Sequence, residues 1–191
     1  MKAGILFIQL FFVAVIFSST VNFSCKNSAV PNTNTTRAVI DTSKENLGEQ
    51  KVIVQKPVGW VNDYEHILDD KTKNEITLLI EEYQKNSGNQ IAVVTTPSYA
   101  PYDSIGGFAI ALANQWGIGL KEKNNGVLIV VSSYFHQVRI ATGLGMEEKL
   151  PDDYCEVVIN EAMIPEFKKD DYATGIKNAV NMIIKILGAQ H

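Results

Sequence analysis

Four stretches of the chain carry apolar residues at the spacing of an amphipathic helix. In the first of them, Ile76, Leu79, Ile80 and Tyr83 form one apolar stripe. Each stretch begins at or next to acidic or hydroxyl residues of the kind that cap helices, and the first two end at a glycine. The pattern therefore predicts four helices, over Asp69 or Asp70 to Ser87, Asp103 or Ser104 to Trp116, Pro151 to Pro165, and Asp170 or Asp171 to Leu187.

Three shorter segments have the composition of β-strands. Residues 90–96 and 127–132 contain the continuous apolar runs IAVV (91–94) and VLIVV (127–131), which are typical of strands buried on both faces. Residues 137–142 place Val138 and Ile140 on one face. Buried strands combined with amphipathic helices predict an α/β fold, a three-layer α/β/α sandwich with a small mixed β-sheet.

The last two of these strands form a predicted hairpin. They are separated by four residues, so that Ser132 pairs with Gln137. Extending this register places the polar run KNNG (123–126) beside the run TGLGME (142–147). Paired residues on neighbouring strands lie about 5 Å apart. Even an error of one or two residues in the register would leave the two runs together.

Residues 1–24 have the pattern of a lipoprotein-type signal peptide. An apolar stretch over 4–17 follows Lys2, and it is short for a membrane span. Ser24 stands directly before Cys25, as in a bacterial lipoprotein processing site. Lipidation of Cys25 would anchor the protein stably, because several acyl chains act together. The alternatives are plain secretion with cleavage near Ser19, or a retained N-terminal anchor.

The remainder of the chain divides into a tether and one domain. Residues 25–56 are polar and low in aromatic residues, which predicts a flexible tether. Residues 57–191 contain enough apolar residues for a single domain. The expected location is the cell envelope, as a periplasmic or outer-membrane lipoprotein. A net charge of −4 with scattered basic residues argues against a nucleic-acid partner.

Oxygen-bearing residues gather where the predicted hairpin places the two polar runs together. Asn124 and Asn125 come from the first run, Glu147 comes from the second, and Glu148 follows directly after it. Carboxylate, amide and carbonyl oxygens on loops suit a hard cation, Ca²⁺ above all. Zinc is not expected, because the chain has no His or Cys pair at ligand spacing, and Cys155 is interpreted as a small core residue. The competing interpretation is a turn, since Asn-Gly commonly separates strands.

Five blocks of the sequence resemble, in order and spacing, those of the TPM domain family. They cover about 57–187, and they are GWVNDYEHIL (59–68), SGNQIAVVTT (87–96), WGIGLKEKNNGVLIVVS (116–132), VRIATGLGMEEKL (138–150) and FKKDDYATGI (167–176). The resemblance implies an α/β/α sandwich, divalent-metal binding in some members, chiefly of Ca²⁺, and an acid-phosphatase activity reported for plant members.

The resemblance also carries over residue by residue. Positions that match the family motifs are Asn62, Asp63, Asn125, Gly126, Gly143, Gly145 and Glu147. Where the family usually has Asp-Asn-Gly, this chain has Asn124 in place of the aspartate, so that one charge is missing from the site. The resemblance makes Asp63 a candidate ligand, provided that it reaches the same edge; otherwise it is a turn residue. Trp116 also matches and is interpreted as core packing.

Three functions remain open from the sequence. The first is a tethered binding or maintenance module that holds Ca²⁺, or Mg²⁺, through Asp63, Asn124, Asn125 and Glu147. The second is a metal-assisted phosphatase acting on a phosphorylated partner, with Asp63 and Glu147 as the candidate carboxylates and Arg139 as a third candidate residue. The third is a structural or partner-binding domain that exposes aromatic residues on loops, namely Tyr99, Tyr102, Tyr134 and Phe135.

Overall fold

The structure, a computed structural model, describes residues 56–188. The predicted signal peptide, Cys25 and the predicted tether up to residue 55 lie outside the described residues. No helix within 56–188 is both long enough and apolar enough to cross a membrane. The described elements are β1 (Val61–Asp63), α1 (Asp70–Ser87), β2 (Gln90–Thr95), α2 (Ile105–Trp116), β3 (Gly126–Ser132), β4 (Gln137–Thr142), a 3₁₀ turn (Leu144–Met146), α3 (Asp152–Val158), a π-helical turn (Ile159–Met163), α4 (Ile164–Phe167) and α5 (Tyr172–Gly188).

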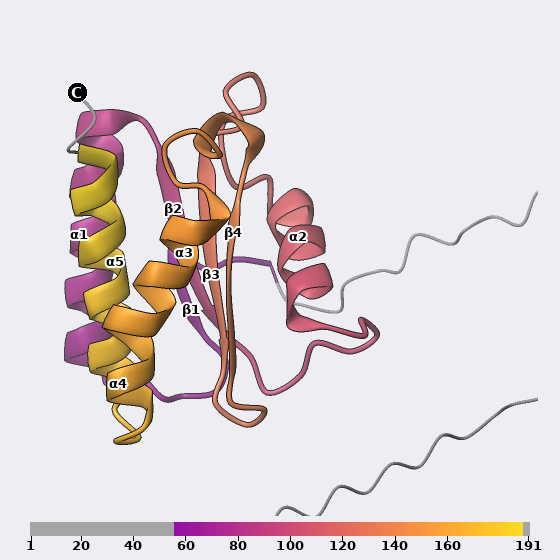
Figure 1. The fold of residues 1–191 in the computed structure, drawn as a ribbon, viewed down its shortest axis with the longest axis vertical. Coiled ribbons are helices and arrows are strands. Elements are labelled where there is room, and N and C mark those ends of the chain that lie inside the picture. Colours follow the sequence, from indigo (N-terminus) through magenta and orange to yellow (C-terminus); the bar gives the residue numbers. More distant parts are fainter. Residues whose placement is uncertain (1–55, 189–191) are drawn as a thin grey trace, which may run out of the picture. The chain divides into compact units, whose positions relative to one another are not determined.

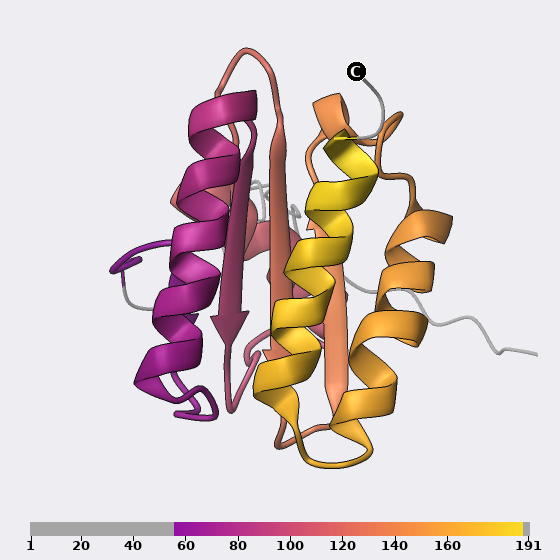
Figure 2. The same cartoon turned by 90° about the vertical axis from the view of Figure 1, so that its left-hand side faces the viewer.

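The strands form one mixed sheet in the order β1-β2-β3-β4. β1, β2 and β3 are parallel, and β4 is antiparallel to β3. Helices α1, α3, α4 and α5 cover one face of the sheet, and α2 covers the other (Figure 1). Figure 2 shows α1, α5 and the α3–α4 segment side by side in front of the strands. The predicted three-layer sandwich with a small mixed sheet is confirmed.

Each face of the sheet has its own hydrophobic core, because successive residues of a strand point to opposite faces. Val93 and Ile129 pack in the core beneath α1 and α5. Val94 and Leu128 pack in the second core, against Phe108 of α2. The two central strands are therefore covered on both sides, as their continuous apolar sequences predict.

The edge strand β1 is not predicted by the sequence, since three residues are too few to show a period. A turn held by Asn62 precedes it: the Asn62 side chain accepts the Val58 N–H at 2.8 Å and donates to the Gly59 carbonyl at 2.8 Å. β1 is parallel to β2, with Asp63 opposite Thr95. Its C-terminal end therefore lies at the edge where β2 and β3 also end.

The helical segment that begins at Asp152 continues beyond Pro165, contrary to the prediction. The chain passes from α3 through the π-helical turn into α4, which contains Pro165. Proline has no N–H to donate within a helix. In the wider turn, the Ile164 N–H donates to the Ile159 carbonyl five residues back, and the helix continues past the proline.

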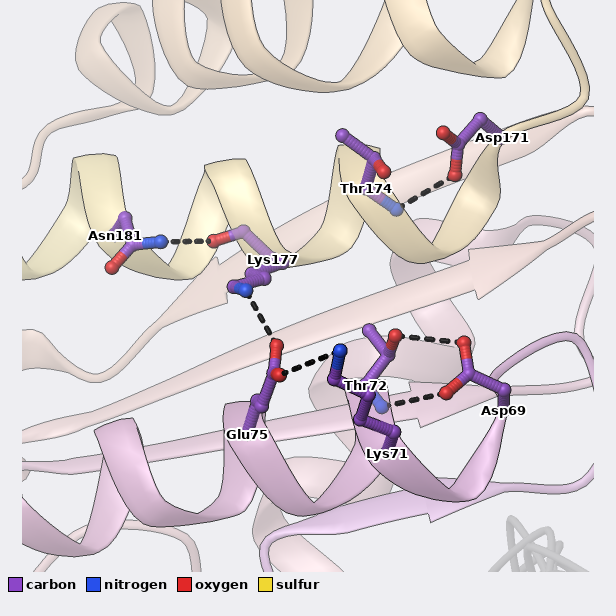
Figure 3. A network of polar contacts seen from close by, with 8 residues as sticks. All are labelled: Asp69, Lys71, Thr72, Glu75, Asp171, Thr174, Lys177 and Asn181. Carbon is purple, nitrogen blue, oxygen red and sulfur yellow. Dashed lines mark hydrogen bonds and ion pairs between the residues drawn. The ribbon is translucent and has the colours of Figure 1, made fainter.

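An ion pair joins α1 to α5 on the outer surface of the helical layer (Figure 3). Lys177 Nζ lies 2.6 Å from Glu75 Oε2. The hydrogen bond from Lys177 and its positive charge lower the pKa of Glu75 below its ordinary value. The first turns of the two helices are capped by Asp69 and Asp171, as the sequence predicts, through backbone N–H groups.

Candidate functional site

The two polar runs meet at the edge of the sheet where β3 begins and β4 ends. Ser132 pairs with Gln137, which confirms the predicted register. Beyond the paired strands, the Gly145 N–H donates to the Asn124 carbonyl at 3.1 Å. The runs 123–126 and 142–147 are therefore in direct contact, and this edge is the candidate site.

The glycines of the second run allow this contact. A Cβ on Gly143 would overlap the carbonyl oxygen of Asn124, and a Cβ on Gly145 would overlap that of Lys123. The two backbones lie too close for any side chain between them. The Gly-x-Gly pattern is thus explained by close packing of two loops.

Asn125 is a buried structural residue, with 5% of its surface exposed. Its Oδ1 accepts the Leu120 N–H at 2.9 Å. Its Nδ2 donates to the Gly88 carbonyl at 2.9 Å and to Asn89 Oδ1 at 3.1 Å. The side chain ties the loop before β3 to the turn between α1 and β2, and both ends of the amide are already engaged.

Asn124 and Glu147 are arranged differently. Both are exposed, and both line a hollow of about 350 Å³ together with Asn114 and Thr142. Asn124 has a φ of 48°, in the left-handed region that asparagine tolerates. Neither side chain makes a hydrogen bond to another described residue. Of the four predicted ligands, only Asn124 and Glu147 line the same hollow and have side chains that are free to bind a cation.

Asp63 lies at the opposite edge of the sheet, so the expectation that it joins the other three residues is wrong. It is level with Thr95 and Val131, whereas Asn125 precedes the Gly126–Gln90 pair at the other end of the same strands. Six strand residues correspond to roughly 20 Å. The reason is the parallel orientation of β1, which the sequence does not reveal.

The Asp63 carboxylate is occupied at this opposite edge. It accepts the N–H groups of Ile67 at 3.2 Å and Leu68 at 2.9 Å, and it also accepts the Thr95 hydroxyl. These bonds shape the turn that leads into α1, so the alternative interpretation of Asp63 as a turn aspartate fits the structure. Asp103 lies after β2 at this same edge, and Ser104 rather than Asp103 caps α2.

Glu65 organises the same edge, although no sequence pattern marks it as a functional residue. Its carboxylate accepts the Ser133 N–H at 3.0 Å, the Ser133 hydroxyl at 3.1 Å and the Tyr134 N–H at 3.2 Å. The partners are 68 or 69 residues away along the chain, in the β3–β4 turn. No local signal marks such a contact.

Two other residues with reactive side chains have structural surroundings. Cys155 is buried, and burial raises the pKa of its thiol to about 11, which leaves it a poor nucleophile. This agrees with its interpretation as a core residue. Arg139 lies 3.3 Å from Asp152, as part of an exposed ion pair.

The aromatic residues on the loops largely pack against one another. The ring centroids of Tyr99 and Phe135 are 4.9 Å apart, as are those of Tyr134 and Phe135. Tyr102 packs edge-on against Phe108 of α2 at 6.0 Å. Tyr134 nevertheless leaves 73% of its surface exposed, at the tip of the β3–β4 turn.

Comparison with known proteins places the chain in a family. A family model described as the TPM domain matches residues 61–186. The chain is similar to the N-terminal domain of a protein from P. gingivalis, with 31% identity over 68% of this chain and 82% of that one and a TM-score of 0.63. No curated protein matches the chain.

Two further solved structures are similar at lower identity. The BA42 protein of Bizionia argentinensis is 20% identical over 66% of this chain and 85% of that one, with a TM-score of 0.58. The N-terminal domain of cg2496 from Corynebacterium glutamicum is 16% identical over 75% and 92%, with a TM-score of 0.55. These two likenesses show the fold alone. Since the family model matches more than half of the chain, the chain belongs to the TPM domain family.

Proposed function

We propose that this TPM domain is a binding module that holds a divalent cation, Ca²⁺ in the first place and Mg²⁺ in the second, in the hollow between Asn124 and Glu147. The observation that carries the proposal is the shared position of these two side chains. A carboxylate and an amide line one hollow and have no hydrogen-bond partner among the described residues. Oxygen ligands of this kind suit a hard cation.

The charge of the site sets the expected affinity. Among residues 56–188, no three carboxylate, histidine or cysteine side chains are placed to hold a metal together. Glu147 is the one carboxylate that lines the hollow, so amide, hydroxyl and backbone oxygens would complete the ligand set. Affinity for Ca²⁺ follows the number of charged ligands, and a Kd of about 1 mM is expected.

Calorimetric titration of the protein with Ca²⁺ tests the proposal. Glu147→Gln is expected to abolish the binding heat, because it removes the charged ligand while it keeps the shape of the side chain. Glu148→Gln is the matched control, since Glu148 is an exposed neighbour that does not line the hollow. Absence of heat in the wild-type protein, or equal heat in wild type and Glu147→Gln, would count decisively against this cation site.

The proposal also includes the membrane anchor. We propose that Cys25 is lipidated, which would place the domain in the cell envelope as a periplasmic or outer-membrane lipoprotein. The sequence pattern around Ser24 and Cys25 supports this. Cys25→Ser is expected to abolish incorporation of labelled palmitate and to release the protein from the membrane fraction. Labelling that persists in the variant would contradict the assignment.

Metal-assisted hydrolysis of phosphomonoesters is the second candidate, because the matching family model carries "phosphatase" in its name. The arrangement that the sequence suggests, in which Asp63 and Glu147 act on one phosphoryl group, is not compatible with their positions at opposite edges of the sheet. An activity centred on the hollow would depend on Glu147 alone. The Glu147→Gln variant therefore serves here as well: hydrolysis of a generic phosphomonoester at an unchanged rate would remove this candidate.

A further inference from the structure

The face of the sheet that α2 covers has a second concave surface, separate from the cation hollow. α2 packs mainly over β4 and β3, and it covers β2 less completely. A pocket of about 380 Å³ remains there, with Ala92 of β2 in its wall. The other lining residues are Pro57, Val58, Gly59, Trp60, Gln90, Trp116, Gly117 and Ile118. A volume of this size is typical of ligand-binding pockets.

Both tryptophans of the chain line this pocket. Trp60 precedes β1, and Trp116 is the last residue of α2. Their rings do not contact each other in the described part of the chain, where the ring pairs involve only tyrosine and phenylalanine. Two separate indole surfaces in one concave site favour a ligand with flat or ring-shaped apolar groups.

The polar groups in the wall offer hydrogen-bond donors. Trp116 Nε1 is buried and has no hydrogen-bond partner among the described residues. Gln90 Oε1 accepts the Gly119 N–H at 2.7 Å, and this hydrogen bond fixes the orientation of the side-chain amide. Within residues 56–188, Gln90 Nε2 has no acceptor either. A ligand that supplies an acceptor would satisfy Gln90 Nε2 directly, whereas Trp116 Nε1 is fully buried and would be reached only after a shift of the indole ring.

The pocket also lacks charge. None of its nine lining residues is acidic, basic or a histidine. A charged ligand would lose its hydration without gaining an opposite charge. The wall therefore fits a neutral ligand that carries apolar rings and acceptor oxygens, and that brings few donors of its own.

We propose that this pocket binds an extended, proline-containing peptide segment of a partner protein. Prolyl residues match each property of the wall: their rings pack on indole surfaces, their carbonyls accept hydrogen bonds, and they have no N–H that would need an acceptor. Proline-rich segments are also preformed in an extended helix, which lowers the entropy lost on binding, and grooves lined by aromatic residues recognise them. A sugar fits less well, because its many hydroxyl donors would require acceptors.

Tryptophan fluorescence of the full-length protein in mild detergent tests this proposal, because both fluorophores line the pocket. Titration with decaproline is expected to give a saturable change in the emission. Trp60→Ala is expected to weaken binding about tenfold, with Trp116 as the remaining reporter. Trp116→Phe keeps an aromatic ring but offers a smaller surface to the ligand, and it is expected to weaken binding about fivefold, with Trp60 as the remaining reporter.

The controls distinguish recognition of proline from nonspecific binding of peptides. A Gly-Ser decapeptide is expected to produce no saturable change. Tyr134→Ala removes an aromatic residue that is 73% exposed at the opposite edge of the sheet, and it is expected to leave the affinity for decaproline unchanged. Equal response to both peptides, no response to decaproline at millimolar concentration, or equal effects of Trp60→Ala and Tyr134→Ala would overturn the proposal. Saturable binding of maltotetraose in place of decaproline would overturn it in favour of a sugar.

This inference is independent of the cation site. The two pockets share only Ile118, and Asn124 and Glu147 belong to the hollow alone. Glu147→Gln is therefore expected to bind decaproline as the wild type does. Loss of Ca²⁺ binding with retained peptide binding, or the reverse, tells which of the two proposals fails.

Discussion

Gly145→Ala is expected to destabilise the domain by about 3 kcal/mol, as measured by denaturant unfolding. The backbone of Gly145 does not have a positive φ, so alanine is not excluded by its own conformation. The cost comes from the contact with the neighbouring loop, where the new methyl group would overlap the Lys123 carbonyl. Backbone atoms on both sides would have to separate, and the Gly145–Asn124 hydrogen bond would be lost.

Gly106→Ala is the matched control for this prediction. Gly106 lies in the first turn of α2, and a Cβ there would meet only the Ser104 hydroxyl at 3.9 Å. Because alanine is a better helix former than glycine, this variant is expected to be neutral or slightly more stable. Unfolding of Gly145→Ala at the same denaturant concentration as the wild type would show that the two loops do not pack as closely as described. The shape of the hollow between Asn124 and Glu147 would then also differ from the one described.

The parts of the fold that follow from local sequence could be predicted. The strands β2, β3 and β4 have continuous or alternating apolar patterns, and the hairpin register follows from the four residues between β3 and β4. That register was enough to bring Asn124 next to Gly145. Prediction failed where the deciding partner is distant. The orientation of β1 depends on pairing with β2, some 30 residues away, and this pairing moved Asp63 to the other edge.

The roles of individual residues at the site were harder to predict than their positions. Asn125 lies where the sequence placed it, but its amide bonds to Gly88 and Asn89, and only the folded α1–β2 turn presents those groups. The role of Glu65 could not be predicted either, because its partners in the β3–β4 turn are far from it along the chain. Residue type identifies a candidate ligand, whereas long-range contacts decide whether the side chain is available.

Replacing asparagine by aspartate is expected to strengthen Ca²⁺ binding at position 124 but to destabilise the domain at position 125. Asn124→Asp adds a carboxylate to the hollow beside Glu147, and it restores the charge that the family motif usually has there. Because Ca²⁺ affinity follows the charge of the ligand set, the Kd measured by calorimetry is expected to fall about tenfold, with little change in stability. An unchanged or weaker affinity in this variant would show that Asn124 is not a ligand of the cation.

Asn125→Asp, in contrast, is expected to destabilise the domain by about 3 kcal/mol at neutral pH. The substitution keeps the acceptor for the Leu120 N–H, but it replaces the donating Nδ2 by an oxygen that faces the Gly88 carbonyl and Asn89 Oδ1. These acceptors and the burial of the side chain raise the pKa of the new carboxyl in the folded state. The folded protein then binds a proton more readily than the unfolded chain, so stability should recover as the pH falls through that raised pKa. Denaturant unfolding of this variant between pH 4 and pH 8 measures the effect. A variant as stable as the wild type at pH 7, with no dependence on pH beyond that of the wild type, would show that the Asn125 amide is free, and would return it to the list of possible cation ligands.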